Sequence, residues 1–478
     1  MKLNWNFDNS YLNLPPIFYS FVKPSVHKNP KIAILNSDLL KKINLKNSSI
    51  NQRELAKNLS AQYNLDKNKF YSQAYAGHQF GHFTMLGDGR ALLLGEHIDK
   101  DNNRYDIQLK GSGKTPYSRN GDGKASLGSM LREYIISESM YNLGIPTTRS
   151  LAVIETGENV IREKELPGAI LTRVAGSHIR VGTFQFALMK NNKDYIEELT
   201  NYTINRHYPE LNNRTNKVEE FLKIVSTKQE DLIVNWMKVG FIHGVMNTDN
   251  MSIIGETIDY GPCAFMDEYN PKTVFSSIDK LGRYSYINQP LIAQWNLARF
   301  AETIFFLIDN DQAIALKKAE NIIKKFKNNY NKKWLVMMKS KIGLINNHKE
   351  DSNLIKELLN IMHIHKLDYT NTFQDLKNNS FNKFNFLTEW YEKYKERLRL
   401  EKTSADSIKK ITDYANPTII PRNHIVDKYI KEAENKQYES LYNFLEIIKN
   451  PYINDNIPKI LKKPPNNDEK ILETFCGT

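Results

Sequence analysis

Cysteine is scarce in this sequence, with 2 residues among 478. The disulfide framework that holds many small secreted domains together is therefore excluded. Long apolar runs are also lacking, since the best candidate, residues 303–308, stops at Asp309 and falls short of the roughly 18 apolar residues of a membrane helix. No secretory or mitochondrial leader is expected, because polar residues such as Asp8 interrupt the early apolar stretches and the first arginine is Arg53. We expect a soluble, cytoplasmic protein with no membrane partner.

Acidic residues are outnumbered: 66 Lys and Arg face 54 Asp and Glu, which leaves a net charge of +12. A positive balance favours phosphate-bearing partners but does not indicate a fold. A nucleic-acid-binding protein would be one explanation of the charge. However, no basic cluster interleaved with aromatic residues stands at recognition spacing, so we expect no specific nucleic acid partner. With 40% hydrophobic and 25% charged residues, the composition is globular.

The chain is too long for one ordinary domain, since about 150 residues per domain predicts two to four units. Residues 1–175 are punctuated by glycine and contain short aliphatic runs. Residues 176–310 are expected to be mostly helices joined by loops. Residues 311–478 are rich in Lys and Asn and are expected to form a helical extension that ends in a tail containing Cys476.

The aliphatic runs of the first region predict strands of an antiparallel or mixed sheet. These runs are residues 91–94, 107–109, 151–154 and 169–172. One helix is expected among them, from Ser126 as N-cap to Gly144, because apolar residues recur on one helical face.

In the middle region, a helix from about Gln229 should lead into the turn-rich stretch 243–250. The run 251–254 should then form a short strand. The polar segment 205–230 is expected to be a surface loop.

Two local patterns look like known sites without meeting their requirements. Residues 113–115 (GKT) look like the end of a phosphate-binding P-loop, but the glycine required five residues before Gly113 is replaced by Gln108. His78 and His82 have the spacing of zinc-binding histidines on a helix, but the expected glutamate after His78 is missing. We therefore expect His78 and His82 to be histidines of a loop or of the protein core that bind no metal.

The order of five features along the chain is more specific than any of them alone. They are a Gly-rich turn before a strand, a Lys at a strand end, a Glu on a helix, an Asn in a loop and an Asp before Tyr-Gly. In this sequence they are Gly87 and Gly89, Lys110, Glu133, Asn250 and Asp259. The same order occurs in kinase-like proteins that use ATP.

The chemistry of nucleotides explains these residue types. A triphosphate needs a cation such as Lys110 near its oxygens, and an ion pair with Glu133 keeps that lysine in place. Mg²⁺ needs hard oxygen ligands, which the carboxylate of Asp259 and the amide of Asn250 supply. Close approach of the backbone to phosphates needs glycine.

One departure from conventional kinases matters. When the loop pattern H-R-D-L-x-x-x-N is aligned on His243 and Asn250, the position of the catalytic Asp holds Val245. By that criterion the protein lacks a kinase base and is a pseudokinase. Asp249 is the nearest replacement carboxylate.

Long motifs over nearly the whole chain resemble the selenoprotein O family, also called the YdiU-type protein adenylyltransferases. The matching stretches are residues 75–81 (YAGHQFG), 86–91 (LGDGRA), 108–113 (QLKGSG), 116–119 (PYSR), 121–123 (GDG), 132–134 (REY), 243–262, 282–286 (GRYSY), 288–290 (NQP), 295–297 (WNL), 416–417 (NP) and 422–423 (RN).

The resemblance implies an α+β, bilobal protein-kinase-like fold. A small β-rich N-lobe (1–175) and a larger helical C-lobe (176–310) would be followed by the C-terminal helical extension. It also implies an enzyme that binds ATP in a flipped orientation, uses Mg²⁺ or Mn²⁺, and transfers AMP instead of phosphate to Ser, Thr or Tyr hydroxyls of proteins.

The resemblance assigns roles to individual residues. Asp249 would accept the proton, Lys110 and its partner Glu133 would take part in catalysis, and Asn250 and Asp259 would hold the metal. The nucleotide-binding positions would be Gly87, Gly89, Arg90, Lys110, Asp122, Gly123, Arg173, Arg180 and Asp259.

The chemistry of two of these residues agrees with a flipped nucleotide. Arg173 and Arg180 follow the last strand expected in the N-lobe, where a conventional kinase would hold adenine against the backbone. Guanidinium groups match phosphate oxygens far better than they match adenine. A flipped nucleotide would turn its phosphates towards them.

The two cysteines suggest a redox hypothesis. Cys476 stands where the family carries selenocysteine or cysteine, here followed by Gly477-Thr478, and Cys263 lies four residues past Asp259. If the tail folds back, a Cys263–Cys476 disulfide could clamp the segment beside the metal site. Two reduced thiols in a reducing cytosol are the expected alternative.

Other functions stay open beside protein adenylylation. A protein kinase would transfer the γ-phosphoryl group, but Val245 is evidence against it. A non-catalytic ATP-binding scaffold would have no need of metal ligands such as Asn250 and Asp259. UMP transfer from UTP is a further possibility that the sequence does not exclude.

Overall fold

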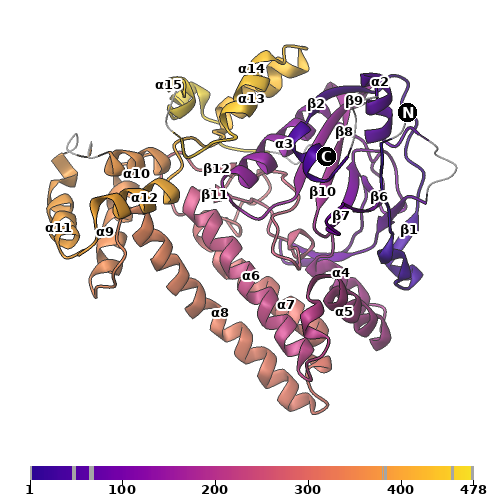
Figure 1. Cartoon of the computed structure of the whole chain (residues 1–478), viewed down its shortest axis with the longest axis horizontal. Coiled ribbons are helices and arrows are strands. Elements are labelled where there is room, and N and C mark those ends of the chain that lie inside the picture. Colours follow the sequence, from indigo (N-terminus) through magenta and orange to yellow (C-terminus); the bar gives the residue numbers. More distant parts are fainter. Residues whose placement is uncertain are drawn as a thin grey trace.

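An antiparallel sheet is the centre of the N-terminal part of the protein (Figure 1). Its strand order is β1-β3-β6-β7-β10-β9-β2, and β8 pairs with β10. The strands are β1 (Tyr19–Phe21), β2 (Lys31–Leu35), β3 (Tyr71–Gln73), β6 (Ala91–Ile98), β7 (Arg104–Lys110), β8 (Ala125–Ser126), β9 (Arg149–Ile161) and β10 (Glu165–Ala175). The computed structural model describes residues 3–45, 50–63, 69–378, 381, 385–453 and 457–474.

Both faces of the sheet are covered, which explains the continuous aliphatic runs in its strands. Successive residues of a strand point to opposite faces, so an all-apolar run needs a core on each side. In β6, Leu93 belongs to the core that contains α3 (Leu127–Asn142). Leu92 belongs to a second core, shared with residues of α1 (Ser37–Lys42) and α2 (Gln52–Leu59).

The four predicted strands are confirmed as parts of β6, β7, β9 and β10. The predicted helix is confirmed as α3. The Ser126 hydroxyl accepts a hydrogen bond from the Ser129 N–H as N-cap. Gly144 follows the helix end with a φ of 77°, a left-handed conformation that glycine adopts without steric cost.

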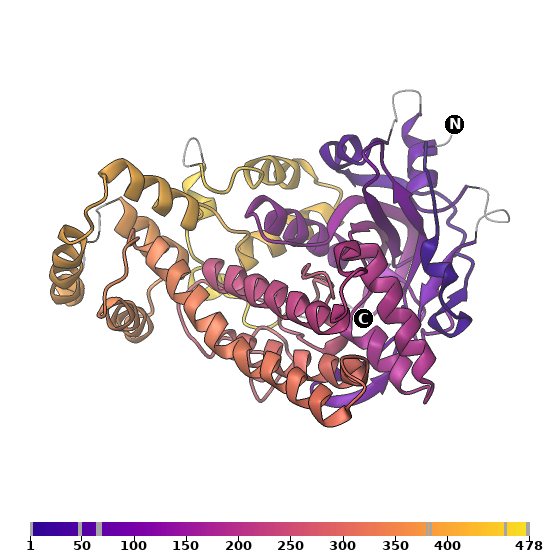
Figure 2. The ribbon, with the colours of Figure 1, turned by 60° about the horizontal axis from the view of Figure 1, so that its bottom comes forward.

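Helices make up most of the remaining chain, and α6, α7 and α8 pack against one another (Figures 1 and 2). The helices are α4 (Val181–Leu188), α5 (Lys193–His207), α6 (Lys217–Val239), α7 (Gln289–Ile304), α8 (Gln312–Lys341), α9 (Asp351–Ile364), α10 (Tyr369–Lys377), α11 (Thr388–Arg399), α12 (Ala405–Ala415), α13 (Asn423–Glu434), α14 (Glu439–Ile447) and α15 (Lys459–Lys462). Two short antiparallel ladders join β4 (Ala76–Gln79) to β5 (His82–Met85) and β11 (Phe241–Ile242) to β12 (Ala264–Phe265). The fold is therefore mixed α/β, and the described residues after 311 are mostly helical.

The prediction of a surface loop at 205–230 is wrong. Helix α5 extends to His207, and α6 already begins at Lys217. The apolar residues of the first turns of α6 recur on one face and are buried: Val218, Phe221, Leu222 and Val225. The polar residues between them belong to the opposite face of the helix, so their number hid the apolar stripe.

The prediction of a strand at 251–254 is also wrong. Ser252 makes an isolated bridge with Arg180, and the chain turns at Gly255, whose φ is 78°. The short ladder of this region is formed instead by β11 and β12, one on each side of the segment.

The C-terminal extension returns to the edge of the sheet, where α14 lies beside β2 (Figure 1). The Tyr442 hydroxyl donates a hydrogen bond to the carbonyl of Ala33 at 2.8 Å. Ala33 lies at a register shift in the pairing of β2 with β9, between Ile32 and Ile34. The helix thus provides a partner for a carbonyl of an edge strand.

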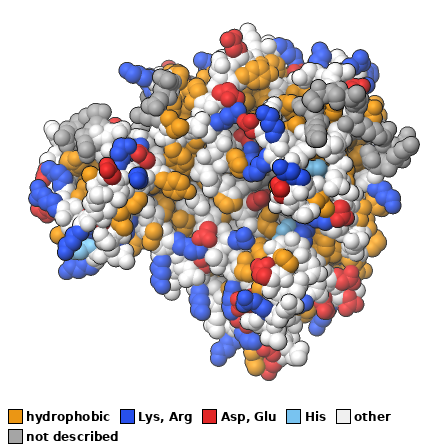
Figure 3. All heavy atoms as spheres, viewed as in Figure 1, with side chains coloured by type: hydrophobic (Ala, Val, Ile, Leu, Met, Phe, Trp, Pro, Cys, Tyr) orange, Lys and Arg blue, Asp and Glu red, His pale blue; other side chains and the backbone are white. Residues whose placement is uncertain are grey.

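Among the residues that the structure describes, none of the helices is long and apolar enough to cross a membrane. On the face shown in Figure 3, Lys and Arg side chains alternate with Asp and Glu and do not gather in one continuous stripe.

A buried arginine of the extension joins two of its helices to the segment after β12. Arg422, the N-cap residue of α13, is 1% exposed and pairs with Asp267 and, at 2.8 Å, with Asp368. The carboxylate of Asp368 also accepts a hydrogen bond from the N–H of Asn371 as the N-cap of α10. One guanidinium group therefore fixes the starts of two helices and the segment after β12.

We expect Arg422→Met to lower the free energy of unfolding by about 3–5 kcal/mol, because it leaves two largely buried carboxylates without their cation. Chemical denaturation measures the change. The matched control is Lys409→Met, since Lys409 pairs with Asp413 on α12 but is 72% exposed. That change should leave the free energy of unfolding nearly unchanged, because an exposed ion pair contributes little to stability. Equal effects of the two substitutions would contradict the anchoring role.

Candidate functional site

A cavity of about 870 Å³ lies between the sheet and the helices that follow it. Its walls come from the turn before β6, the end of β7, the loop between β7 and α3, β10 and the segment between β11 and β12. Most of the site residues predicted from the sequence line it: Gly87, Gly89, Arg90, Lys110, Asp122, Gly123, Arg173, Arg180, Asp249, Asn250 and Asp259. Glu133 is the exception and lies behind the wall, where it contacts Lys110.

Three cations converge on the carboxylate of Asp259. Its Oδ1 lies 2.8 Å from Lys110 Nζ and 2.7 Å from Arg173 Nη2, and its Oδ2 lies 3.2 Å from Arg180 Nη1. Burial alone would raise the pKa of Asp259, but these cations hold it well below its usual value. Asp259 is therefore a carboxylate at neutral pH.

A second carboxylate supports the cluster from the opposite side. Glu133, 2% exposed on α3, lies 2.7 Å from Lys110 Nζ and 2.7 Å from Arg173 Nη2. Together with Arg180, the cluster holds three positive and two negative charges. The remaining positive charge suits an anion such as phosphate.

Arg180 is fully buried and held on several sides. Its guanidinium lies 4.3 Å from the ring centre of Tyr75, and its Nη1 donates to the carbonyl of Asp249 at 3.0 Å. Its Nε donates to the carbonyl of His178 at 3.2 Å. The side chain is therefore fixed before any ligand binds.

Asp249 lies in the short 3₁₀ turn Thr248–Asn250 and is 6% exposed. Within the described part of the chain, its Oδ1 has no hydrogen-bond partner. Burial raises the pKa of Asp249 to about 6, although the nearby Arg180 opposes the shift. A buried carboxylate with a raised pKa is a better proton acceptor than an ordinary aspartate.

The hairpin of β4 and β5 covers this turn. The His78 N–H donates to Thr248 Oγ1 at 2.7 Å, and the Phe80 N–H donates to Asn247 Oδ1 at 3.1 Å. A Cβ atom on Gly77 would lie 2.1 Å from Asp249 Oδ1. The absence of a side chain at Gly77 is therefore what lets the carboxylate lie against the strand.

Sequence reasoning missed the role of this hairpin. Residues 75–81 carry the family resemblance, but nothing local to them predicts a contact with the turn at Asp249, and His78 and His82 are expected only to be histidines of a loop or a core. The two histidines lie on opposite strands of the hairpin instead. The local signal was Phe80-Gly81, whose positive φ values of 52° and 91° belong to a two-residue hairpin turn.

The glycines of the turn before β6 are required by protein packing. A Cβ on Gly87 would lie 2.4 Å from the ring of Tyr117, and one on Gly89 would lie 2.9 Å from the Tyr117 carbonyl. The loop between β7 and α3 therefore packs directly on this turn. The sequence predicts that these glycines let the backbone approach phosphates, and packing against the loop is a second reason for glycine at both positions.

The rim of the cavity holds an ion pair that the sequence did not reveal. Arg162 donates to both carboxylate oxygens of Asp122, at 3.0 and 3.1 Å. Arg162 also lines the cavity, although no motif drew attention to it. Next to it, Gly123 has a φ of 68°, and a Cβ there would meet the carbonyl of Gly113 at 2.1 Å.

The residues present fit a metal that is held partly by a ligand's phosphates. The described residues contain no group of three or more His, Cys, Asp or Glu that could hold a metal ion. Mg²⁺ is usually bound by one or two protein oxygens together with substrate phosphates and water. Asn250 Nδ2 donates to the Val245 carbonyl at 2.9 Å, which fixes the amide and leaves its oxygen as the candidate ligand beside Asp259.

The redox hypothesis stays a prediction. Cys263 is fully buried, and its carbonyl accepts a hydrogen bond from Arg132 Nη2 at 2.8 Å. Cys476 lies outside the described residues.

Comparison with known proteins gives matches over the whole chain. A family model described as protein adenylyltransferase SelO matches residues 1–449. A protein nucleotidyltransferase YdiU from Pelagibacter ubique is 51% identical over 484 residues, which cover 100% of each chain. Proteins of the same name from Brevibacillus brevis and Clostridium perfringens are 51% and 50% identical, over 99% and 100% of this chain and 98% of each relative.

We expect Gly77→Ala to reduce turnover by about 10²-fold or more while the protein stays folded, because the new Cβ displaces the Asp249 carboxylate. Steady-state kinetics and thermal unfolding measure the two effects. The control is Thr84→Ala, which changes the residue paired with Gly77 on β5 and should leave turnover nearly unchanged. Full activity of Gly77→Ala would remove Asp249 from the mechanism.

We expect Asp259→Asn to abolish metal-dependent turnover but to bind ATP more tightly in EDTA, by about tenfold, or about 1.4 kcal/mol. Without metal, the carboxylate competes with phosphate oxygens for Lys110, Arg173 and Arg180. Calorimetric titration in EDTA measures the affinity. Asp413→Asn, a carboxylate that pairs with Lys409 and does not line the cavity, is the control and should not change ATP binding. Unchanged or weaker binding by Asp259→Asn would refute this account of the cluster.

Proposed function

Because the chain belongs to the protein adenylyltransferase SelO family, we propose that it transfers AMP from ATP to Ser, Thr or Tyr hydroxyl groups of proteins. The observation that carries the proposal is the buried cluster of Lys110, Arg173 and Arg180 around Asp259. In this reaction the hydroxyl oxygen bonds to the α-phosphorus, the bond from the α-phosphorus to the bridging oxygen breaks, and pyrophosphate leaves.

A bilobal kinase-like architecture is part of the proposal. The sheet with α3 would be the small N-lobe (1–175), and α4 to α7 would belong to the larger C-lobe (176–310), with residues 311–478 as an extension. The position of the cavity between these parts supports the division. So does the contact between Lys110 at a strand end and Glu133 on a helix, which kinases use to orient a phosphate-binding lysine.

The cations would bind the phosphates that leave. Arg173 and Arg180 are both 1% exposed, so their charges act in a medium of low polarity, where they interact strongly with phosphate. Their guanidinium groups would spread the negative charge of the departing pyrophosphate. Lys110 would lie closer to the α-phosphate, since Glu133 holds it from the side of α3.

Asn250 and Asp259 would hold Mg²⁺ or Mn²⁺, which when bound supplies charge stabilisation to the phosphate oxygens. Asp249, which lines the cavity, would take the proton of the attacking hydroxyl on its carboxylate. Its raised pKa, near 6, supports this role. A general base of this kind contributes roughly 10²–10⁴-fold to the rate.

Three other functions remain as alternatives to be tested. A protein kinase would transfer the γ-phosphoryl group, but Val245 places an apolar side chain in the cavity where kinases have a carboxylate. A non-catalytic scaffold would bind ATP without turnover. UMP transfer from UTP would use the same phosphate chemistry with a different base.

The deciding experiment incubates the protein with a mixture of candidate protein substrates and ATP labelled on either the α- or the γ-phosphate. We expect label from α-labelled ATP to become bound to protein and pyrophosphate to be released. Arg173→Ala and Arg180→Ala should each lower kcat/KM for ATP by about 10–100-fold, since each removes a charged hydrogen-bond donor to phosphate.

The control variant is Lys409→Ala, which is remote from the cavity and should keep full activity. Labelling from γ-labelled ATP alone would replace adenylylation by a kinase activity. Binding of ATP without any labelling would favour the scaffold. A parallel incubation with α-labelled UTP tests UMP transfer.

A further inference from the structure

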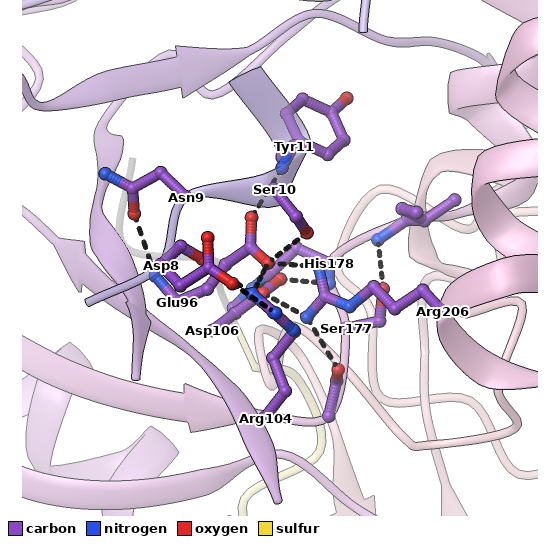
Figure 4. A network of polar contacts seen from close by, with 12 residues as sticks. Asp8, Asn9, Ser10, Tyr11, Glu96, Arg104, Asp106, Ser177, His178 and Arg206 are labelled. Carbon is purple, nitrogen blue, oxygen red and sulfur yellow. Dashed lines mark hydrogen bonds and ion pairs between the residues drawn. The ribbon is translucent and has the colours of Figure 1, made fainter. Parts of the chain in front are cut away.

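A buried ion cluster behind the cavity joins the sheet to the helices (Figure 4). Its acids are Glu96 on β6 and Asp106 on β7, and its cations are Arg104 on β7 and Arg206 on α5. The N-terminal segment closes it, since the Ser10 hydroxyl donates to Glu96 Oε2 at 2.6 Å. None of these residues lines the cavity, so the cluster is separate from the site described above.

Arg206 is the part of the cluster that comes from the helices. Its Nη2 lies 2.6 Å from Asp106 Oδ1, and its Nη1 lies 3.4 Å from Glu96 Oε2. Its Nη2 also donates to the carbonyl of Gly176, in the connection between β10 and α4, at 3.1 Å. The side chains of Arg206, Asp106 and Glu96 are 5%, 1% and 0% exposed.

The second oxygen of Asp106 holds the connection itself. Asp106 Oδ2 accepts a hydrogen bond from the His178 N–H at 2.8 Å and lies 3.1 Å from His178 Nδ1. Burial lowers the pKa of His178, so the ring is neutral and its Nδ1–H donates to the carboxylate. Both the backbone and the ring of His178 are therefore fixed by one residue of the sheet.

His178 in turn holds Arg180. The His178 carbonyl accepts a hydrogen bond from Arg180 Nε at 3.2 Å, and Arg180 Nη1 points to Asp259. One path from Asp106 to the cavity thus runs through His178 and Arg180. A displacement of the His178 backbone would move one of the acceptors that hold the Arg180 guanidinium.

We propose that Asp106, clamped by Arg206, is a positioning residue that holds His178 and thereby aims the guanidinium of Arg180 at the phosphates of bound ATP. This inference rests on the proposed function for the phosphate-binding role of Arg180. A buried ion cluster is rarely the most stable way to fill a core, because desolvation offsets most of the attraction. It does impose one geometry, since hydrogen bonds to carboxylates are directional. The ion cluster can therefore orient His178 and Arg180 in a way that a packed apolar core could not.

The test is a double-mutant cycle on ATP binding, measured by calorimetric titration with Mg²⁺. We expect Asp106→Asn to weaken ATP binding about tenfold in the otherwise unchanged protein. In the Arg180→Ala background, the same substitution should have less than about a twofold further effect, because its influence passes through Arg180. The matched control is Arg104→Gln, which removes a cation of the same cluster that pairs with Glu96 and Asp8. It should leave ATP affinity within about twofold.

His178 supplies a second, independent variant pair. His178→Asn keeps a side-chain N–H donor near the position of Nδ1 and should bind ATP almost as the unchanged protein does. His178→Leu removes the donor and should resemble Asp106→Asn. If Asp106→Asn lowers the melting temperature too far for titration, the cycle is run with His178→Leu and Arg180→Ala.

An equal loss from Asp106→Asn with and without Arg180 would overturn the inference, as would a similar loss from Arg104→Gln. Direct binding does not depend on which phosphorus is transferred. Protein labelling from γ-labelled ATP alone would therefore contradict the proposed function, but the double-mutant cycle on ATP binding could still be interpreted. Additive effects in a protein that does form AMP adducts would defeat only the positioning role.

Discussion

The carboxylate of Asp259 lies among cations that reach it from three parts of the chain. Lys110 ends β7, Arg173 lies on β10, and Arg180 starts α4. The first two share a face of the sheet, because Lys110 is paired with Leu171 and Arg173 follows two residues later. Like charges this close are tolerable only with acids between them, which makes the position of Glu133 on α3 part of the same constraint. Strand register, helix position and the turn at Asp259 therefore depend on one another.

Strands of the N-terminal part position residues on both sides of the cavity. The hairpin of β4 and β5 reaches the turn that carries Asp249, and Gly77 provides the space for that carboxylate. On the opposite flank, Asp106 reaches the connection that carries Arg180. Asp249 and Arg180 are therefore both held by contacts from strands, although both belong to the segments that follow the sheet.

Local signals in the sequence were sufficient where neighbours in the chain decide the structure. Ser126 and Gly144 bound a helix through their own backbone preferences, and the aliphatic runs formed strands because both sheet faces are covered. The order of Lys110, Glu133 and Asp259 predicted residues that do meet in space. The contact of His78 with Thr248 spans 170 residues and that of Asp106 with Arg206 spans 100, and no local pattern encodes either. The start of α6 was missed for a different reason, since polar residues outnumber its buried apolar stripe.

The return of α14 to β2 has a consequence for synthesis of the chain. β2 is the last strand in the order of the sheet, and the hydroxyl of Tyr442 is a partner for its Ala33 carbonyl across 409 residues. Until the ribosome has made those residues, the nascent sheet carries an edge strand without this cover, and such edges favour association with other chains. A product truncated before α14 would keep that edge exposed permanently. The nascent chain should therefore need chaperones until its last part has been synthesised, well after the cavity residues have been made.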